Sequence, residues 1–77
     1  MEKRLSDVKL GEDCILQSVN LYGSQRRRLR DLGFLTGTKL RCAYIAPSGS
    51  PVAIWIRGTL LALRLEDCDR ITVQCHA

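Results

Sequence analysis

The chain has 77 residues, which allows one small domain with a limited core and leaves little room for the separate scaffold and active-site layers of an enzyme. Its formal charge of +4 favours acidic partners, and much of that excess comes from one arginine cluster. No apolar run approaches the ~20 residues that cross a bilayer, and the first residues lack a signal-peptide core. We therefore expect a single non-enzymatic cytoplasmic domain over residues 1–77, with its core at about residues 5–75.

The first part of the chain is predicted to be an arm followed by a strand. Residues 5–12 read as an arm that tucks a few apolar side chains under the domain, and the strand covers about residues 14–21. Its apolar residues alternate with polar ones, which is typical of a half-buried strand with a polar interruption. The side chains expected on one face of it are Ile15, Gln17, Val19 and Leu21.

A short helix is predicted next, between a start signal at Ser24 and a stop signal at Gly33. If Gly33 adopts the left-handed conformation, Phe34 and Leu29 make the hydrophobic contact of a Schellman cap. The helix then has roughly eight residues, too few to be stable alone, so packing must hold it. Leu29 and Leu32 are expected to share the packed face.

Four arginines lie on this helix. At ~100° per residue, Arg26, Arg27 and Arg30 project away from the packed face, and Arg28 flanks it. Arginine in a first turn opposes the helix dipole, so local stability does not explain the cluster. It is either a solvated face neutralised by nearby carboxylates or a contact surface for an anionic partner, since guanidinium pairs bidentately with carboxylate or phosphate. The carboxylates available for neutralisation are those of Glu12, Asp13 and Asp31.

The rest of the chain predicts four more strands, over residues 39–46, 52–57, 60–65 and 71–75. Gly58 and Thr59 are expected to form a tight hairpin turn, and residues 66–70 a turn or helical turn. Leu40, Cys42, Ile71 and Val73 should face inward. Alternation also places Val52, Ile54 and Ile56 on one face of their strand, and Leu61, Leu63 and Leu65 on one face of theirs. Five short strands and one helix predict a mostly β fold, a small antiparallel barrel with the helix between its first two strands.

The four cysteines are interpreted as reduced thiols, because they are scattered and lack the density of a secreted disulfide scaffold. Cys14, Cys42 and Cys68 are expected to fill the core as small apolar residues. The spacing of a structural zinc or iron–sulfur site is missing. Only Cys75 and His76 are adjacent, and this tail pair is a weak candidate for sharing a soft metal with a neighbouring molecule. No cofactor is predicted.

Trp55 lies on the strand face opposite Ile54 and Ile56. It either packs beneath the N-terminal arm, which is the interpretation we favour, or stands outward beside Arg57. In the second case it would be an aromatic anchor of the kind enriched at binding hot spots.

Motifs along most of the chain resemble the FeoA family. They are Leu-Gly-Glu at 10–12, Arg-Arg-Leu-Arg-Asp-Leu-Gly-Phe at 27–34, and residues 36–38, 46–51, 56–58 and 61–64. The resemblance covers about residues 5–74 and implies an SH3-like barrel, similar to the C-terminal domain of iron-dependent repressors. It also implies a non-enzymatic accessory role in bacterial ferrous iron uptake together with FeoB, a membrane GTPase permease.

On this basis the leading expectation is a module that docks on the cytoplasmic domain of FeoB and reaches the membrane only through it. The residues expected to contact the partner are Arg26, Arg27, Arg30, Leu29 and Trp55. The arginines would supply charge complementarity, and Leu29 would add contact area or hold the helix in place.

Two other functions are weighed against docking. A nucleic-acid-binding barrel would need a stacking platform, and the chain has four aromatic residues, of which Phe34 is expected inside. A metal-sensing domain like that of the repressors would need converging histidine and carboxylate ligands, whereas the chain has a single histidine. An exposed edge strand would also permit a homo-oligomer.

Overall fold

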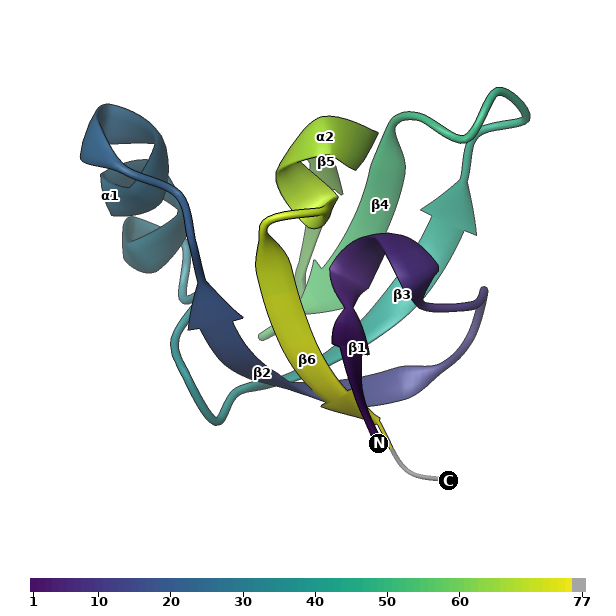
Figure 1. The fold of residues 1–77 in the computed structure, drawn as a ribbon, viewed down its shortest axis with the longest axis horizontal. Helices are drawn as coiled ribbons and strands as arrows, with labels where there is room; N and C mark the ends of the chain where they lie inside the picture. The colour runs from purple at the N-terminus through teal and green to yellow at the C-terminus, as the bar shows by residue number, and fades with distance from the viewer. Residues whose placement is uncertain (76–77) are drawn as a thin grey trace.

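The computed structural model describes residues 1–75, which form a curled antiparallel sheet with helices at its margins (Figure 1). The strands are β1 (Glu2–Arg4), β2 (Asp13–Val19), β3 (Lys39–Ile45), β4 (Val52–Ile56), β5 (Thr59–Leu63) and β6 (Ile71–Cys75). The helices are the short 3-10 helix η1 (Leu5–Asp7), α1 (Gly23–Asp31) and α2 (Leu65–Cys68). The strand order in the sheet is β1-β6-β2-β3-β4-β5. The mostly β architecture and the helix inserted after the first long strand are therefore confirmed.

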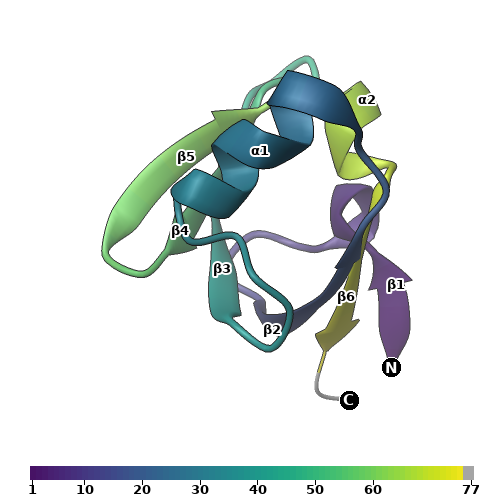
Figure 2. The same ribbon diagram turned by 90° about the vertical axis from the view of Figure 1, so that its left-hand side faces the viewer.

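The sheet curls around one hydrophobic core, as the view toward α1 shows (Figure 2). The largest fully buried side chains come from η1, β2, β4 and β6, elements that are far apart in the sequence. They are Leu5, Leu16, Ile54, Ile56, Ile71 and Val73. The core therefore depends on long-range pairing of strands rather than on any local segment.

A sixth strand that the sequence did not predict precedes the arm of residues 5–12. Glu2–Arg4 pairs with β6, and the Met1 amino group donates to the Cys75 carbonyl at 2.6 Å. Three consecutive charged residues give no apolar alternation, which is why the strand was missed. Beyond it, Leu5 and Val8 are buried, so the predicted tucking of apolar residues under the domain is confirmed.

The inner face of β2 differs from the prediction. Cys14 and Leu16 are buried, whereas Ile15 is only half-buried. The pairing of β2 with β6 shifts register between Leu16 and Ser18, which is a β-bulge. A bulge adds one residue to the strand and so reverses which side chains face inward. Beyond it, Leu21 lies in the core as expected.

The alternation of β3 to β6 is confirmed with one exception. The residues expected to face inward or to share one face of their strand are buried at Leu40, Cys42, Val52, Ile54, Ile56, Leu61, Leu63, Ile71 and Val73. Leu65 instead begins α2 and is exposed.

The β4–β5 hairpin turn also lies one residue earlier than predicted. Ile56 pairs with Thr59, so the turn consists of Arg57 and Gly58, and both have positive φ (50° and 75°). Positive φ at both central residues is the requirement of a type I′ turn, whose twist matches that of the flanking strands.

Two of the four cysteines are not reduced, which contradicts the prediction. Cys14 and Cys75 are direct partners across β2 and β6 and form a disulfide. They are 61 residues apart in the sequence, so only the strand order brings them together. Cys42 and Cys68 are free and buried, as predicted for core-filling cysteines.

The start of α1 was predicted two residues too late, because the expected cap was Ser24. The helix begins at Gly23, after Tyr22 as the N-cap residue, and no side chain makes a capping hydrogen bond there. Ser24 therefore lies inside the first turn, and the prediction that it caps the helix was wrong.

The end of α1 is confirmed in detail. Gly33 has a φ of 93°, its N–H donates to the Arg30 carbonyl at 3.0 Å, and the Phe34 N–H donates to the Leu29 carbonyl at 2.9 Å. These are the two hydrogen bonds of a Schellman motif, and Leu29 and Phe34 are both buried. Leu32 is 37% exposed, so its expected place on the packed face was wrong.

Replacing Gly33 with alanine should lower the free energy of unfolding by about 1–2 kcal/mol. The new side chain would be strained at a φ of +93°, and its Cβ would lie 2.6 Å from the Arg57 Cδ. Gly37→Ala is the matched variant, because Gly37 has a φ of +91° but no atom within 4 Å of an added Cβ. Urea denaturation should show the larger loss at Gly33. A Gly33→Ala protein as stable as the wild type would contradict the cap.

Cys42 and Cys68 should resist alkylation in the folded protein at neutral pH. Both side chains are 0% exposed. Burial raises the pKa of both thiols, that of Cys68 to about 12 with a further contribution from Asp67 and Asp69. Iodoacetamide followed by mass spectrometry should label neither thiol in native protein and both in denaturant. Labelling of either thiol in the native protein would disprove this burial.

Candidate partner-binding surface

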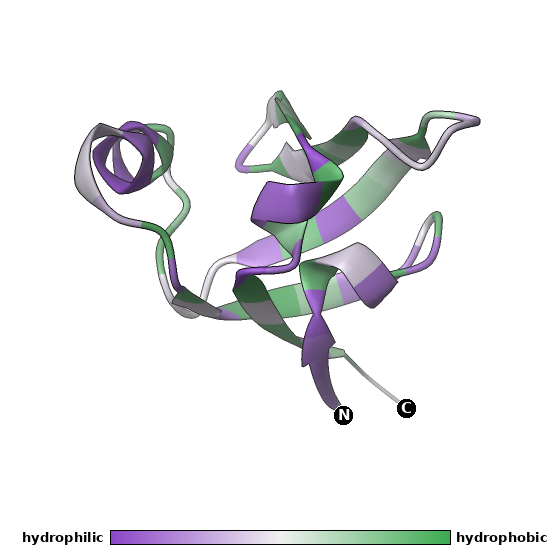
Figure 3. Ribbon diagram, turned by 45° about the horizontal axis from the view of Figure 1, so that its top comes forward, coloured by the Kyte–Doolittle hydropathy of each residue, from purple (hydrophilic) through white to green (hydrophobic). Residues whose placement is uncertain are grey.

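Helix α1 lies at the side of the barrel, and in the chain it follows β2 and precedes β3 (Figures 1 and 2). Leu29 is the single buried residue of the helix. The helix is coloured almost wholly as hydrophilic in Figure 3, in contrast to the strands. It therefore presents a polar surface that rests on one leucine and on the C-terminal cap.

The four arginines of α1 are all exposed. Within residues 1–75, none of the guanidinium groups of Arg26, Arg27, Arg28 and Arg30 forms an ion pair with a carboxylate of the chain. The cluster is therefore a patch of uncompensated positive charge on a helix that does not need it for stability.

The carboxylates expected to neutralise this patch point elsewhere. Glu12 pairs with Lys3 at 2.9 Å, and Asp13 forms a two-bond pair with Arg41 whose shorter contact is 2.7 Å. Asp31 is exposed on α1 itself. Glu12 and Asp13 therefore do not neutralise the α1 arginines, as the interpretation of a solvated, neutralised face had supposed.

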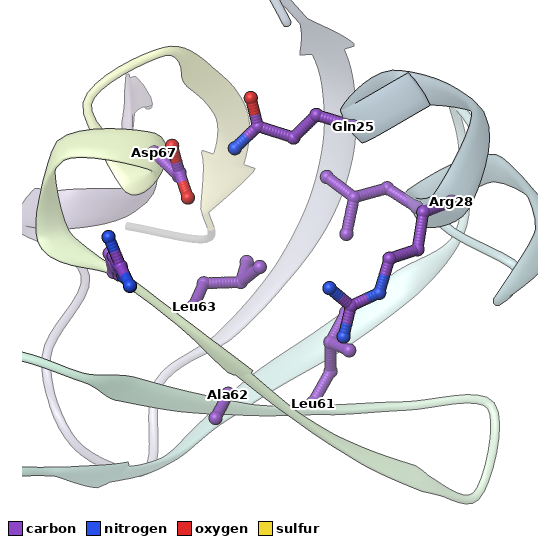
Figure 4. A pocket seen from close by; sticks show the side chains of 8 residues that line it. Gln25, Arg28, Leu61, Ala62, Leu63 and Asp67 are labelled. Atoms are coloured by element: carbon purple, nitrogen blue, oxygen red, sulfur yellow. The ribbon is translucent and has the colours of Figure 1, made fainter. Parts of the chain in front are cut away.

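A groove runs between α1, β5 and α2 (Figure 4). Gln25 and Arg28 reach into it from α1, and Asp67 from α2, while β5 forms its wall. Its lining residues are Gln25, Arg28, Leu29, Leu61, Ala62, Leu63, Arg64 and Asp67. The groove thus combines an apolar floor with two guanidinium groups. Arg28 and Arg64 were not predicted as site residues, because nothing in the sequence shows that β5 passes beside α1.

A second hollow lies at the other side of the helix. Arg26 and Arg30 line it together with Leu29 and Phe34. The structure thus brings these two predicted arginines to one rim, whereas Arg27 lines neither hollow. Leu29 is 4% exposed, so of its two predicted roles the structure supports holding the helix rather than adding contact area.

Trp55 is 49% exposed, so the favoured prediction that it packs beneath the arm was wrong and the outward alternative is confirmed. Its cross-strand neighbours are Arg41 and Leu60, and it lines a hollow that also includes Arg57. The Arg57 side chain in turn lies against Gly33 at the end of α1. Trp55 is therefore not beside the α1 arginines, but Arg57 connects the two surfaces.

Cys75 and His76, the weak candidates for sharing a soft metal, are not available as a pair of free ligands, because Cys75 is in a disulfide. Cys75 is bonded to Cys14, and a disulfide sulfur is not the thiolate that zinc needs. His76 lies outside the described residues. Within residues 1–75, one cluster brings metal-ligating side chains together, and it consists of Glu12, Cys14 and Cys75.

Within the described part of the chain, no helix is long and apolar enough to cross a membrane.

Comparison with known proteins gives the family. The FeoA domain matches residues 3–75. The chain is 31% identical over 71 residues to the Fe(2+) transport protein A/Fe(2+) transporter FeoB fusion protein of Porphyromonas gingivalis, a match that covers 92% of this chain but 8% of that protein.

Solved structures of FeoA proteins have the same fold as this chain. The FeoA protein of Chlorobium tepidum superimposes with a TM-score of 0.92 at 37% identity, covering 97% of this chain and 71% of that one. The FeoA of Stenotrophomonas maltophilia, complexed with zinc and described as a procaryotic SH3 domain protein, gives a TM-score of 0.80 at 30% identity and covers 94% and 89% of the two chains. The uncompensated arginine helix and its glycine cap are thus carried on an SH3-like barrel, and the chain belongs to the FeoA family.

Proposed function

We propose that this chain is a non-enzymatic accessory protein of bacterial ferrous iron uptake that docks on the cytoplasmic domain of the FeoB permease and modulates transport. The observation that carries the proposal is the patch of four guanidinium groups on α1 that lacks a carboxylate partner within residues 1–75. A patch of this kind favours an acidic partner and sets the rate and specificity of encounter.

The fusion protein of Porphyromonas gingivalis supports the choice of partner. In it, transport protein A and the transporter FeoB are parts of one chain. Joining two modules raises the effective concentration of each for the other, which helps modules that work in contact. We infer that the separate chain makes the same contact by association, on the cytoplasmic side of the membrane.

The groove beside α1 defines the kind of segment that the partner would offer. Leucines of α1 and β5 line the groove, together with Arg28 and Arg64. An acidic segment with one or two apolar side chains would place those in the groove and pair its carboxylates with the guanidinium groups. Arg26, Arg27 and Arg30 would then act as the outer, charged part of the interface.

Trp55 is proposed as a second anchor. It stands on the outer face of β4, half exposed between Arg41 and Leu60. An exposed tryptophan beside an arginine combines the two residue types most enriched at hot spots.

Removing two of the α1 arginines should weaken the complex. We expect Arg26→Ala/Arg30→Ala to raise the dissociation constant for the soluble cytoplasmic domain of the cognate FeoB about tenfold, which corresponds to ~1.4 kcal/mol. An amide-shift NMR titration at physiological salt measures it, with wild-type shifts concentrated on residues 23–34.

The matched control is Arg4→Ala/Lys9→Ala, which removes the same charge from two exposed positions outside α1, one in β1 and one in the segment that follows η1. It should bind like the wild type. Equal weakening by the two double variants would mean that net charge alone attracts the partner. An absence of shifts at millimolar partner would disprove docking on this domain.

Trp55→Ala should also weaken the complex, by more than tenfold if the indole is an anchor, since hot-spot truncations cost ~2 kcal/mol or more. Tyr44→Ala is the control, because Tyr44 is a similarly exposed aromatic residue (53%) on the neighbouring strand. The same titration measures both variants. A wild-type dissociation constant for Trp55→Ala would remove this residue from the interface.

The nucleic-acid alternative is tested in parallel with single-stranded DNA. Phe34 is buried, which leaves three exposed aromatic residues, Tyr22, Tyr44 and Trp55, and only Tyr44 and Trp55 lie on neighbouring strands. That is a small surface for stacking several bases. Binding of DNA tighter than binding of the FeoB domain, with a steep loss on adding salt, would favour this alternative.

A further inference from the structure

A second cluster of chemically reactive side chains lies away from α1, where β2 and β6 meet. Cys14 and Cys75 are bonded there, and the Glu12 carboxylate lies beside them. One ligand atom from each residue falls within 4.8 Å of the other two. The carboxylate is thus close enough to share one ligand with both sulfurs once the bond between them is broken.

Glu12 is held in place by contacts on both of its oxygens. Its Oε1 accepts a hydrogen bond from the Lys9 backbone N–H at 2.9 Å, and its Oε2 lies 2.9 Å from the Lys3 Nζ. These two contacts fix the orientation of the carboxylate beside the two sulfurs. Each oxygen keeps a free lone pair, because an ionised carboxylate has about four acceptor sites.

We propose that reduction of the Cys14–Cys75 disulfide turns this cluster into a binding site for a thiophilic divalent cation such as Zn²⁺. The ligands are the two cysteine sulfurs and one Glu12 oxygen. Two thiolates and a carboxylate are ligands that zinc accepts in proteins, and water would complete a tetrahedral shell.

The chemistry balances with a dithiol reductant. Its two thiols supply two electrons and two protons to the S–S bond, which breaks to give two cysteine thiols, while the reductant becomes a disulfide. The cation then replaces the two thiol protons, which are released to solvent. Oxidation by a second disulfide reverses the electron transfer and expels the cation.

The backbone around the two cysteines is already fixed for such a site. Cys14 pairs directly with Cys75 across the sheet, and the Cys75 N–H and C=O are both hydrogen-bonded to Met1. With zinc–sulfur bonds of about 2.3 Å and tetrahedral angles, the two sulfurs must lie about 3.7 Å apart. Rotation of the side chains on neighbouring strands provides that separation without a change in strand register.

The net charge of the proposed site and the path to it from solvent are also compatible with binding a divalent cation. Two thiolates, one carboxylate and a divalent cation carry a net charge of −1, which the Lys3 ammonium beside Glu12 offsets. Cys14 lines a surface hollow together with Lys39 and Arg41, which gives a path from solvent. Lys3 thus acts as an outer partner that orients a ligand, as such partners do in known metal sites.

The two buried cysteines do not compete for the cation. Both Cys42 and Cys68 lie in the core, and within residues 1–75 neither of them belongs to a cluster of three metal-ligating side chains. A metal–thiolate signal from folded protein therefore reports Cys14 and Cys75.

The test is a titration of the purified chain with Co²⁺, followed by displacement with Zn²⁺, in the oxidised state and after anaerobic reduction with a phosphine. The reduced wild type should develop thiolate-to-cobalt charge-transfer absorption at one equivalent of metal, and Zn²⁺ should abolish it. The oxidised protein should show none. Zn²⁺ should also raise the melting temperature of the reduced protein only.

Glu12→Gln should weaken zinc binding by the reduced protein at least tenfold, whereas Glu66→Gln, which changes an exposed carboxylate elsewhere, should leave it unchanged. Equal affinity of Glu12→Gln and wild type would overturn the three-ligand site. So would zinc binding that does not depend on reduction, or a reduced chain that stays unfolded with Zn²⁺ present. None of these results bears on docking at α1, so this inference and the proposed function fail independently.

Discussion

The burial of Leu29 against the barrel, together with the Schellman cap at Gly33, holds α1 in its helical form and in its place on the barrel. Leu29 is the one buried side chain of a nine-residue helix, and the cap joins it to Phe34 in the core. A helix of this length is unstable alone, so this contact decides whether it forms. Because a single leucine is enough to anchor it, the other positions are free to carry arginines that no carboxylate within residues 1–75 neutralises.

The sheet provides the fixed frame for both surfaces. On one side, β5 runs beside α1 and forms the wall of the groove with Arg28 and Arg64. At the other margin, β6 lies between β1 and β2, and the Cys14–Cys75 bond joins it to β2. The charged surface and the sulfur cluster are thus separate parts of one small barrel, which allows one of them to change its chemical state while the other keeps its shape.

Local rules predicted much of this fold, and long-range contacts account for most errors. The glycine stop, the Leu29–Phe34 contact and the alternation of β3 to β6 follow from spacing alone, and they were correct. The inner face of β2 was wrong because a bulge beside β6 changed its register. The disulfide and the Arg28–Arg64 groove depend on which strands are neighbours, which no local pattern contains. The favoured prediction for Trp55 was wrong because alternation shows on which face of the strand a side chain lies, but not whether another segment covers that face.

Hydrogen exchange at the end of α1 tests the central claim most directly. The Gly33 and Phe34 amides donate to carbonyls of the last helical turn, beside a buried leucine. If Leu29 and the cap anchor the helix to the core, the Phe34 amide should exchange as slowly as amides of β6, through global unfolding only. Exchange of Phe34 at the rate of an unprotected loop amide, with β6 still protected, would show that α1 opens separately and that the account of its anchoring is wrong.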